Sequence, residues 1–395
     1  MLSKRVKIAL VTAVIVVGVL ACGLLGVFLG YNYVMSQTER YQALEKALEN
    51  KELVITEETP GAVMVIINSG DSTSNIAKSL KELKLIDNEL FFTVMSKFNG
   101  FDGGYLAGTH FLTPDLTYDE IMYLLCQDPK VTRITFPEGV TYIQLKQLLK
   151  QAGLSFYETE LDDCMNSANQ FVDYSFVSQI KTDDDRDFIL NGYLFPDTYD
   201  FDMNASAEDI VRTFLRNTEN YLIPDYYFRA EKLGMSMDEV LVLASIIQNE
   251  ANVKKEYITD MFLISAVFHN RLNSDDPGMR KLQSCASINF LREKDGLPKV
   301  WAASTADQMR ESPYNTYMYE GLPPGPICMP GKLAIQAALY PEPNVNYYYF
   351  CATGDGGTAF AVTLEEHEAN VAAYEQYWND QNAQEATETT ESDND

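Results

Sequence analysis

An uncharged apolar run near the N-terminus constrains this 395-residue chain more than any other feature. Residues 8–30 read IALVTAVIVVGVLACGLLGVFLG. At about 1.5 Å per residue, a helix of this length can cross the roughly 30 Å hydrocarbon layer of a bilayer. Lys4, Arg5 and Lys7 precede the run, so the positive-inside rule places residues 1–7 in the cytoplasm. The sequence therefore predicts a single-pass protein of the cell membrane whose remaining chain is extracytoplasmic.

A cleaved signal peptide or a lipoprotein signal fits this run less well. The apolar core of a signal peptide is shorter than this one. The sequence Val19-Leu20-Ala21-Cys22 resembles a lipoprotein processing site, but the chain stays apolar for more than a helical turn beyond Cys22. An anchor and a lipid would both hold the protein at the outer face of the membrane.

The charge of the chain limits its partners. A formal net charge of -27 opposes binding to nucleic acid or to an anionic membrane surface, whereas a neutral or zwitterionic polymer remains compatible. Part of this charge lies in residues 379–395, which lack Lys and Arg and are expected to form a disordered acidic tail.

The cysteines and histidines give no sign of a metal site. The six cysteines show no CxxC spacing and only three histidines are present, so we expect neither a metal nor another cofactor. Spacing leaves open whether Cys285, Cys328 and Cys351 stay reduced or include a disulfide pair.

Between the run and the tail, the patterning predicts two folded units of α+β class. Residues 31–60 are rich in helix formers without a strong apolar stripe and are expected to form a stalk or linker. Residues 61–129 read as a small domain, in which a strand, a Gly-Asp turn and an amphipathic helix resemble a LysM-like module. Residues 130–378 read as a larger mixed α+β domain, with a long helical stretch from Ser206 to Leu233.

The most informative helix places a carboxyl group on an apolar face. Its start is marked by Ser236 and Glu239, which have the spacing of a capping box. One face of this helix, by i, i+3, i+4, i+7 spacing, contains Leu243, Ile246, Ile247 and Glu250. Burial would raise the pKa of Glu250 towards neutrality, as a general acid requires. The pattern alone leaves open an exposed Glu250 paired with Lys254 or Lys255.

An ordered series of motifs indicates the role of this helix. The motifs are, in chain order, FPEG, GYLFPDTY, LASIIQNEA, VFHNRL, GMRKLQS, SPYNTY, GLPPGPI and ATGDGGTAFAVTLEEH. They resemble those of the MltG/YceG-like endolytic murein transglycosylases, over roughly residues 63–374. The resemblance makes residues 130–378 the catalytic domain and implies a lytic transglycosylase that cleaves the MurNAc-GlcNAc β-1,4 bond of nascent glycan strands. It also implies peptidoglycan synthases and division or elongation proteins as partners.

The resemblance also implies roles for individual residues. Glu250 matches the catalytic acid, which would protonate the leaving oxygen and then deprotonate the C6 hydroxyl of the sugar to give a 1,6-anhydro end. Residues matching the family's substrate groove are Gln283, Ser284, Tyr314, Asn315, Thr316 and Tyr317. Asn315 is also a common turn former, so a purely structural role remains an alternative for it.

Three positions depart from the family pattern. Gln248 stands where the family has a first acid, Cys285 where it usually has Asp, and Asn191 where it commonly has Glu. These departures motivate an alternative, a catalytically weak peptidoglycan-binding or scaffolding protein. A second alternative is a glycan hydrolase, which needs a second carboxylate. The candidates for that carboxylate are Glu138, Asp197 and Asp355.

Overall fold

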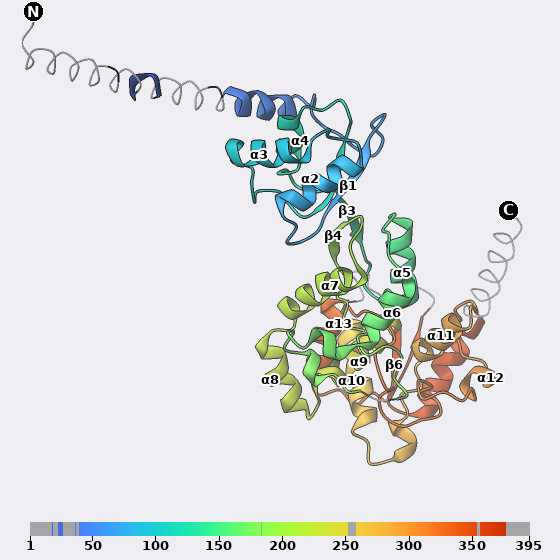
Figure 1. The fold of residues 1–395 in the computed structure, drawn as a ribbon. Helices are drawn as coiled ribbons and strands as arrows, with labels where there is room; N and C mark the ends of the chain where they lie inside the picture. The colour runs from blue at the N-terminus through green and yellow to red at the C-terminus, as the bar shows by residue number, and fades with distance from the viewer. Residues whose placement is uncertain are drawn as a thin grey trace, which may run out of the picture. The chain divides into compact units, whose positions relative to one another are not determined.

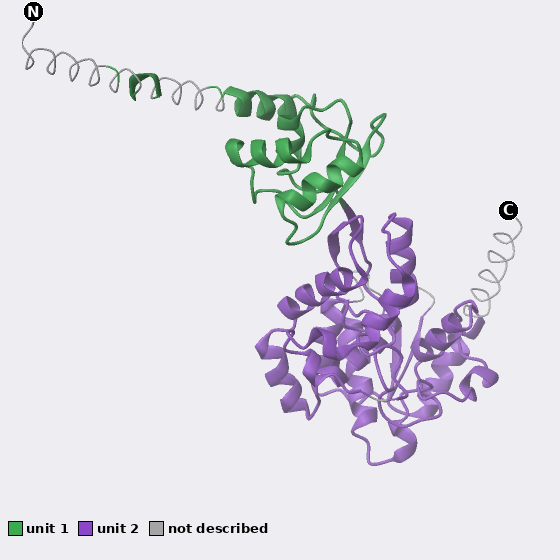
Figure 2. Cartoon of the chain, in the orientation of Figure 1, with its two compact units in different colours: residues 1–131 green, residues 132–395 purple. Residues whose placement is uncertain are grey.

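The computed structural model describes residues 18, 23–26, 36, 39–182, 184–251, 258–353 and 356–376. Most of the predicted transmembrane run and all of the predicted acidic tail lie outside these residues. In the described part of the chain, no helix has both the length and the apolar character needed to cross a bilayer. The chain divides into two compact units, residues 1–131 and 132–395 (Figure 2).

Unit 1 is a small α+β fold. Its elements are β1 (Val63–Ile67), α2 (Thr73–Glu82), α3 (Glu89–Asn99), β2 (Gly108–Leu112) and α4 (Tyr118–Leu124). The two strands pair antiparallel, with Val65 opposite His110. Ser72 caps α2 by accepting a hydrogen bond from the backbone of Asn75, so the predicted Gly-Asp turn does lead into a capped helix. The β-α-α-β order is observed, and the sugar-binding role suggested by the LysM-like pattern stays a prediction.

Part of the predicted stalk belongs to the core of unit 1. Residues 39–49 are helical, and Tyr41, Leu44 and Leu48 pack against the buried cluster of this unit. Leu53, further along the same segment, is only 4% exposed. The apolar positions 41, 44 and 48 follow i, i+3, i+7 spacing, which makes a stripe too narrow to stand out in the sequence but sufficient for packing.

Unit 2 is predominantly helical, with two small sheets (Figure 1). The first sheet pairs β3 (Val131–Thr135) with β4 (Thr198–Asp202), and the second pairs β5 (Tyr349–Ala352) with β6 (Thr358–Ala361) as an antiparallel hairpin. Its α-helices include α5 (Tyr142–Gln151), α6 (Glu158–Asn166), α7 (Ala207–Tyr221), α8 (Pro224–Leu233), α9 (Met237–Glu250), α10 (Ile258–Leu272), α11 (Cys285–Lys294), α12 (Thr305–Gln308) and α13 (Lys332–Leu339). Short 3-10 turns span Ala168–Phe171, Val177–Gln179 and Pro277–Arg280, and residues 364–376 are helical.

The helical stretch predicted from Ser206 to Leu233 is two helices. α7 ends at Tyr221, and α8 starts at Pro224. Ile223 is extended, with φ -73° and ψ 154°, because a residue that precedes proline avoids the α region. Pro224 itself suits the first helical turn, where its missing N–H costs nothing.

Helix α9 forms the centre of unit 2, packed against α8, α10, α11 and α13. Its predicted start is confirmed: the backbone of Glu239 donates to the Ser236 hydroxyl at 3.2 Å, and the Glu239 carboxylate accepts from the backbone of Ser236 at 2.8 Å. The helix is buried from Val240 to Gln248, so neighbours surround it on all sides. This packing fixes the position of its last residue, Glu250.

Candidate active site

The carboxylate of Glu250 lies at the N-terminus of α11. One of its oxygens, Oε1, accepts a hydrogen bond from the backbone N–H of Ala286 at 3.0 Å and another from the hydroxyl of Ser284. Ser284 is the N-cap residue of α11, but its side chain makes no capping bond to its own helix. The Glu250 carboxylate therefore caps α11 in place of the N-cap side chain, although it belongs to another helix. It lies at the positive end of the α11 dipole.

Two opposing effects act on the protonation of Glu250. Burial raises the pKa of its carboxyl group, because removal from water disfavours the charged form. The hydrogen bonds from Ser284 and from the backbone of Ala286 and Cys285 lower the pKa, and burial dominates. Glu250 can therefore hold a proton at higher pH than an ordinary glutamate. Once it has given up the proton, the same hydrogen-bond donors stabilise the carboxylate. Glu250 is half-buried rather than exposed, and Lys254 and Lys255, its partners in the alternative, lie outside the described residues.

Glu250 lines a cavity of about 830 Å³ in unit 2. This volume is near the upper end for small-molecule sites, which span roughly 300–1,000 Å³. Of the residues predicted from the sequence, Gln283 and Tyr317 line the same cavity. Its wall also contains aromatic and charged side chains that include Arg271, Trp301, Tyr348, Tyr349, His367 and Glu368.

Thr316 holds the segment that carries Gln283 and Ser284. The carbonyl of Thr316 accepts from the backbone of Gln283 at 3.0 Å, and its hydroxyl accepts from the backbone of Ser284, also at 3.0 Å. The Ser287 hydroxyl lies 2.9 Å from the same Thr316 oxygen. Ser284 and Thr316 are 1% and 2% exposed. Both therefore position neighbouring groups, and Ser284 does so by direct contact with Glu250.

Tyr314 and Asn315 lie in the interior and are not among the residues that line the cavity. The hydroxyl of Tyr314 accepts from the backbone of Asp187 at 2.9 Å. Asn315 is fully buried, and its side-chain oxygen accepts from the backbone of Tyr317 at 3.0 Å. Its amide nitrogen donates to the carbonyls of Asp307, Gln308 and Arg310. These contacts favour the structural role for Asn315.

The three departures from the family pattern lie in different surroundings. Gln248 is buried, and its side-chain oxygen accepts from the backbone of Gly331 at 2.9 Å, a bond that a glutamate could also accept. Asn191 is buried and donates to the carbonyl of Pro326 at 2.6 Å. Cys285 lines the cavity, where burial raises the pKa of its thiol to about 12 and keeps it protonated at neutral pH.

The described cysteines do not form the disulfide that the spacing left open. Cys126, Cys164, Cys285, Cys328 and Cys351 are all free thiols. Cys351 shares the cavity with Cys285.

The acids named for a hydrolytic alternative do not line the cavity. Glu138 is exposed, and its carboxyl group lies close to the backbone of Gly331. Asp197 accepts from the side chains of Asn217 at 3.1 Å and Tyr221 at 3.4 Å. Asp355 lies outside the described residues. The acids that do line the cavity beside Glu250 are Glu368 and Glu375, both on exposed turns of the helix at residues 364–376.

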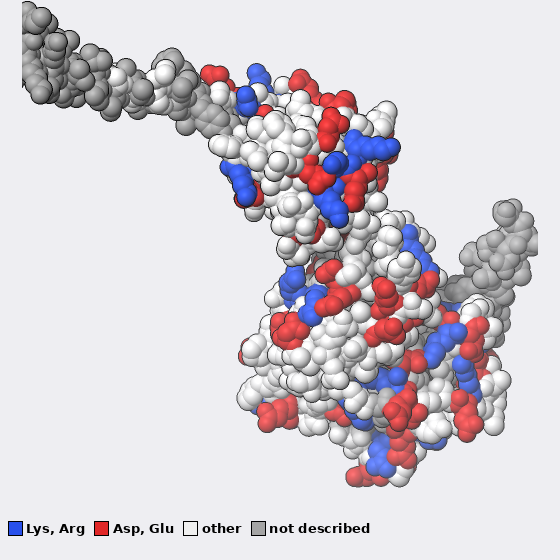
Figure 3. Space-filling model, viewed as in Figure 1, with Lys and Arg blue, Asp and Glu red and all other residues white. Residues whose placement is uncertain are grey.

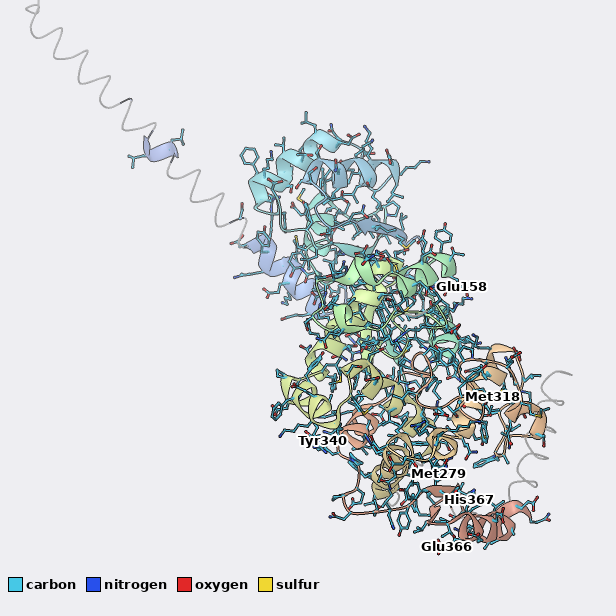
Figure 4. All side chains as sticks on the ribbon, turned by 90° about the horizontal axis from the view of Figure 1, so that it is seen from below. Glu158, Met279, Met318, Tyr340, Glu366 and His367 are labelled. Atoms are coloured by element: carbon cyan, nitrogen blue, oxygen red, sulfur yellow. The ribbon has the colours of Figure 1, made fainter. Side chains whose placement is uncertain are left out.

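A stack of rings on the cavity wall was not predicted. His367 stacks on Tyr349 with ring centroids 5.2 Å apart, and the Tyr349 hydroxyl contacts the sulfur of Met279 at 3.4 Å. Figure 4 labels His367 and Met279, which lie in the same part of unit 2. The guanidinium of Arg271 lies over the same ring, 5.5 Å from its centroid. The VFHNRL motif contains Arg271, but the sequence gives no sign that α10 turns this side chain towards the segment that carries Gln283.

The comparisons with known proteins agree with the motif series. Residues 65–373, most of the chain, match the model of the YceG-like family. The chain belongs to the YceG-like family. The resemblance stated from the motifs is thus confirmed.

Two relatives of this chain have the same name. A Bacillus subtilis (strain 168) protein named endolytic murein transglycosylase is 30% identical over 79% of this chain and 85% of its own length. A Streptococcus pneumoniae protein of the same name is 28% identical over 88% of this chain, but the match spans only 62% of that longer protein. A crystal structure of a yceG-like protein from Listeria monocytogenes superposes with a TM-score of 0.53 at 30% identity, covering 78% of this chain and 98% of the other.

Proposed function

We propose that this YceG-like protein is a membrane-anchored lytic transglycosylase of peptidoglycan. It would cleave the MurNAc-GlcNAc β-1,4 bond within nascent glycan strands without water and leave 1,6-anhydroMurNAc ends. The observation that carries the proposal is Glu250, a carboxyl group with a raised pKa and two donors on one oxygen, at the wall of a large cavity. The names of the relatives support the same enzyme class.

One carboxyl group can serve both halves of this reaction. Protonated Glu250 gives its proton to the glycosidic oxygen as the C1–O bond breaks, and positive charge develops on the sugar ring. The carboxylate that results takes the proton of the C6 hydroxyl, whose oxygen bonds to C1 and closes the anhydro ring. The proton returns to Glu250, so the acid is regenerated. Ser284 and the backbone of Ala286 stabilise the carboxylate between the two transfers.

The other predicted groove residues divide into two roles. Gln283 and Tyr317 line the cavity and are proposed to contact the sugars directly. Ser284, Thr316 and Asn315 are proposed to hold the catalytic segment in place, because each is buried and bonded within the protein. Tyr314, which is buried and accepts from the backbone of Asp187, is proposed to have a structural role as well. This division narrows the set of substrate-binding residues expected from the motifs.

The surface is compatible with an uncharged polymer. On the face seen in Figure 3, acidic and basic side chains are interspersed over unit 2. This face therefore shows no extended basic patch that would attract a polyanion. Glycan recognition would then depend on hydrogen bonds and aromatic faces within the cavity.

We further propose that residues 8–30 anchor the protein in the cytoplasmic membrane with the enzyme outside. The support is the uncharged run itself and the three basic residues before it. A position beside the membrane would place the enzyme near newly made strands and near peptidoglycan synthases and division or elongation proteins. Cells converted to spheroplasts test the orientation: added protease should digest unit 2, and protection of unit 2 would contradict it.

Product analysis tests the reaction. The full-length protein in detergent, given uncrosslinked glycan strands, should produce 1,6-anhydro-muramyl ends detectable by mass spectrometry. Glu250→Gln should abolish these ends, whereas the matched variant Glu368→Gln, altered in the same cavity, should still form them. Reducing ends would indicate a hydrolase, and binding without cleavage would indicate a scaffolding protein. Anhydro ends formed by Glu250→Gln would refute the assignment of the acid.

A further inference from the structure

Arg271 joins three parts of the cavity wall. It comes from α10 and is only 4% exposed. Its Nε donates to the carbonyl of Lys281 at 2.8 Å, and Nη1 donates to the carbonyl of Tyr348 at 2.9 Å. Its Nη2 donates to the side-chain oxygen of Gln283. The rigid guanidinium fork thus fixes Gln283 against the segment that leads into β5.

The contact with Arg271 settles which way the amide of Gln283 faces. A guanidinium has five N–H donors and no acceptor, so only the oxygen of the amide can face it. The amide nitrogen of Gln283 must then point away from Arg271. Gln283 is an exposed residue that lines the cavity, and in the described part of the chain this nitrogen has no protein partner.

The backbone of Gln283 is held in an unusual conformation. Its φ is +53°, in the left-handed region that residues other than glycine rarely adopt. The bond from its N–H to the carbonyl of Thr316 and the bridge between Lys281 and Gly321 keep it there. A strained residue at a cavity wall, with its side chain also fixed, indicates a role in the site.

We propose that Arg271 is a positioning residue that makes Gln283 a dedicated hydrogen-bond donor for the carbonyl oxygen of a sugar N-acetyl group. The proposal rests on the glycan substrate proposed above. A sugar hydroxyl can both donate and accept, so an amide N–H does not distinguish it from its neighbours. An N-acetyl carbonyl can only accept, whereas the ammonium group of a de-N-acetylated sugar can only donate. A donor fixed by Arg271 therefore selects the acetylated sugar.

The variant Gln283→Glu separates this role from a structural one. The carboxylate has the same shape and accepts from Arg271 more strongly than an amide does, so the fold should be retained or stabilised. It has no N–H to offer an acetyl group. We expect kcat/KM on acetylated strands to fall roughly tenfold, the effect of losing one hydrogen bond to the acetyl carbonyl. On chemically de-N-acetylated strands the variant should lose less or gain, because its carboxylate can pair with the ammonium group.

A control variant and a second test variant complete the experiment. Gln308→Glu adds the same charge to the same cavity at a side chain that Arg271 does not contact, and should keep the wild-type preference for acetylated strands. Arg271→Lys keeps the positive charge but loses the fork, so Gln283 can turn its amide and the preference should weaken. Thermal unfolding of each variant shows whether the fold is retained.

The possible outcomes are distinct. The inference is supported if the ratio of kcat/KM values for acetylated and de-N-acetylated strands falls in Gln283→Glu while the melting temperature holds. It is overturned if that ratio stays at the wild-type value, if the variant is destabilised, or if the wild type itself shows no preference. If the wild type cleaves neither substrate, the proposed function itself fails. If the wild type cleaves both substrates with the same kcat/KM, only the inference about Gln283 fails.

Discussion

Replacing Ser284 by alanine should shift the pH dependence of the reaction in a defined direction. The Ser284 hydroxyl donates to Glu250 and lowers the pKa of that carboxyl group, so its removal should raise the pKa further. A general acid works in its protonated form, and kcat/KM falls as the pH rises through its pKa. The alkaline limb of the profile should therefore move to higher pH in Ser284→Ala.

The size of the effect follows from the bond that is lost. A hydrogen bond to a charged group contributes about 1.5–3 kcal/mol, and about 1.4 kcal/mol corresponds to a factor of ten in an equilibrium. The balance between protonated and ionised Glu250 should thus shift towards the protonated form by roughly tenfold or more. The backbone N–H of Ala286 remains as a donor, so Glu250 keeps part of its stabilisation.

The assay is the release of soluble fragments from glycan strands, measured as kcat/KM over a range of pH. Ser287→Ala is the matched control, because Ser287 is equally buried and donates to the carbonyl of Ser284 at 2.8 Å, without contact to Glu250. This control should leave the alkaline limb in place. An unmoved limb in Ser284→Ala, or one that moves to lower pH, would refute the role given to this bond.

Three further predictions concern groups in unit 2. Asp238→Asn should cost about 3–5 kcal/mol in urea unfolding, because both side chains of its ion pair with Arg186 are buried and the guanidinium would lose its counter-charge; an unchanged midpoint would contradict this. Gly192→Ala should lower the melting temperature, since Gly192 has φ +86° and a Cβ atom there would lie 2.4 Å from the rigid ring of Pro326; an unchanged melting temperature would contradict this. Cys285 should react slowly with iodoacetamide at pH 7 and faster as the pH rises towards about 12, followed by mass spectrometry of its peptide; fast reaction at neutral pH would show that its thiol is less shielded than the structure indicates.

Local rules explain why much of the fold could be predicted. The capping box of Ser236 and Glu239 and the turn before α2 depend on neighbours in the sequence, and both were found where expected. The break before Pro224 follows an equally local rule that the helical pattern from Ser206 to Leu233 concealed. The contribution of Leu53 to the core of unit 1 depends on tertiary packing, which no short pattern encodes.

In the site, too, local patterns predicted some features, whereas tertiary contacts determined the others. Periodicity placed Glu250 on an apolar stripe, and the motif series selected it as the acid. Neither could show that its carboxylate meets the start of α11, because Ala286 is 36 positions away in the chain. Asn315 and Tyr317 are neighbours in one motif, yet one is buried and the other lines the cavity. The side-chain directions that separate them are set by contacts with distant segments.

The most direct test of the proposed mechanism is the fate of solvent oxygen during cleavage. Glycan strands are digested by the full-length protein in water enriched in oxygen-18, and the new ends are analysed by mass spectrometry. Because the C6 hydroxyl of the sugar attacks C1, the mechanism predicts anhydro ends that contain no solvent oxygen. Incorporation of oxygen-18 at C1 of the new ends would show that water is the nucleophile and would contradict the mechanism.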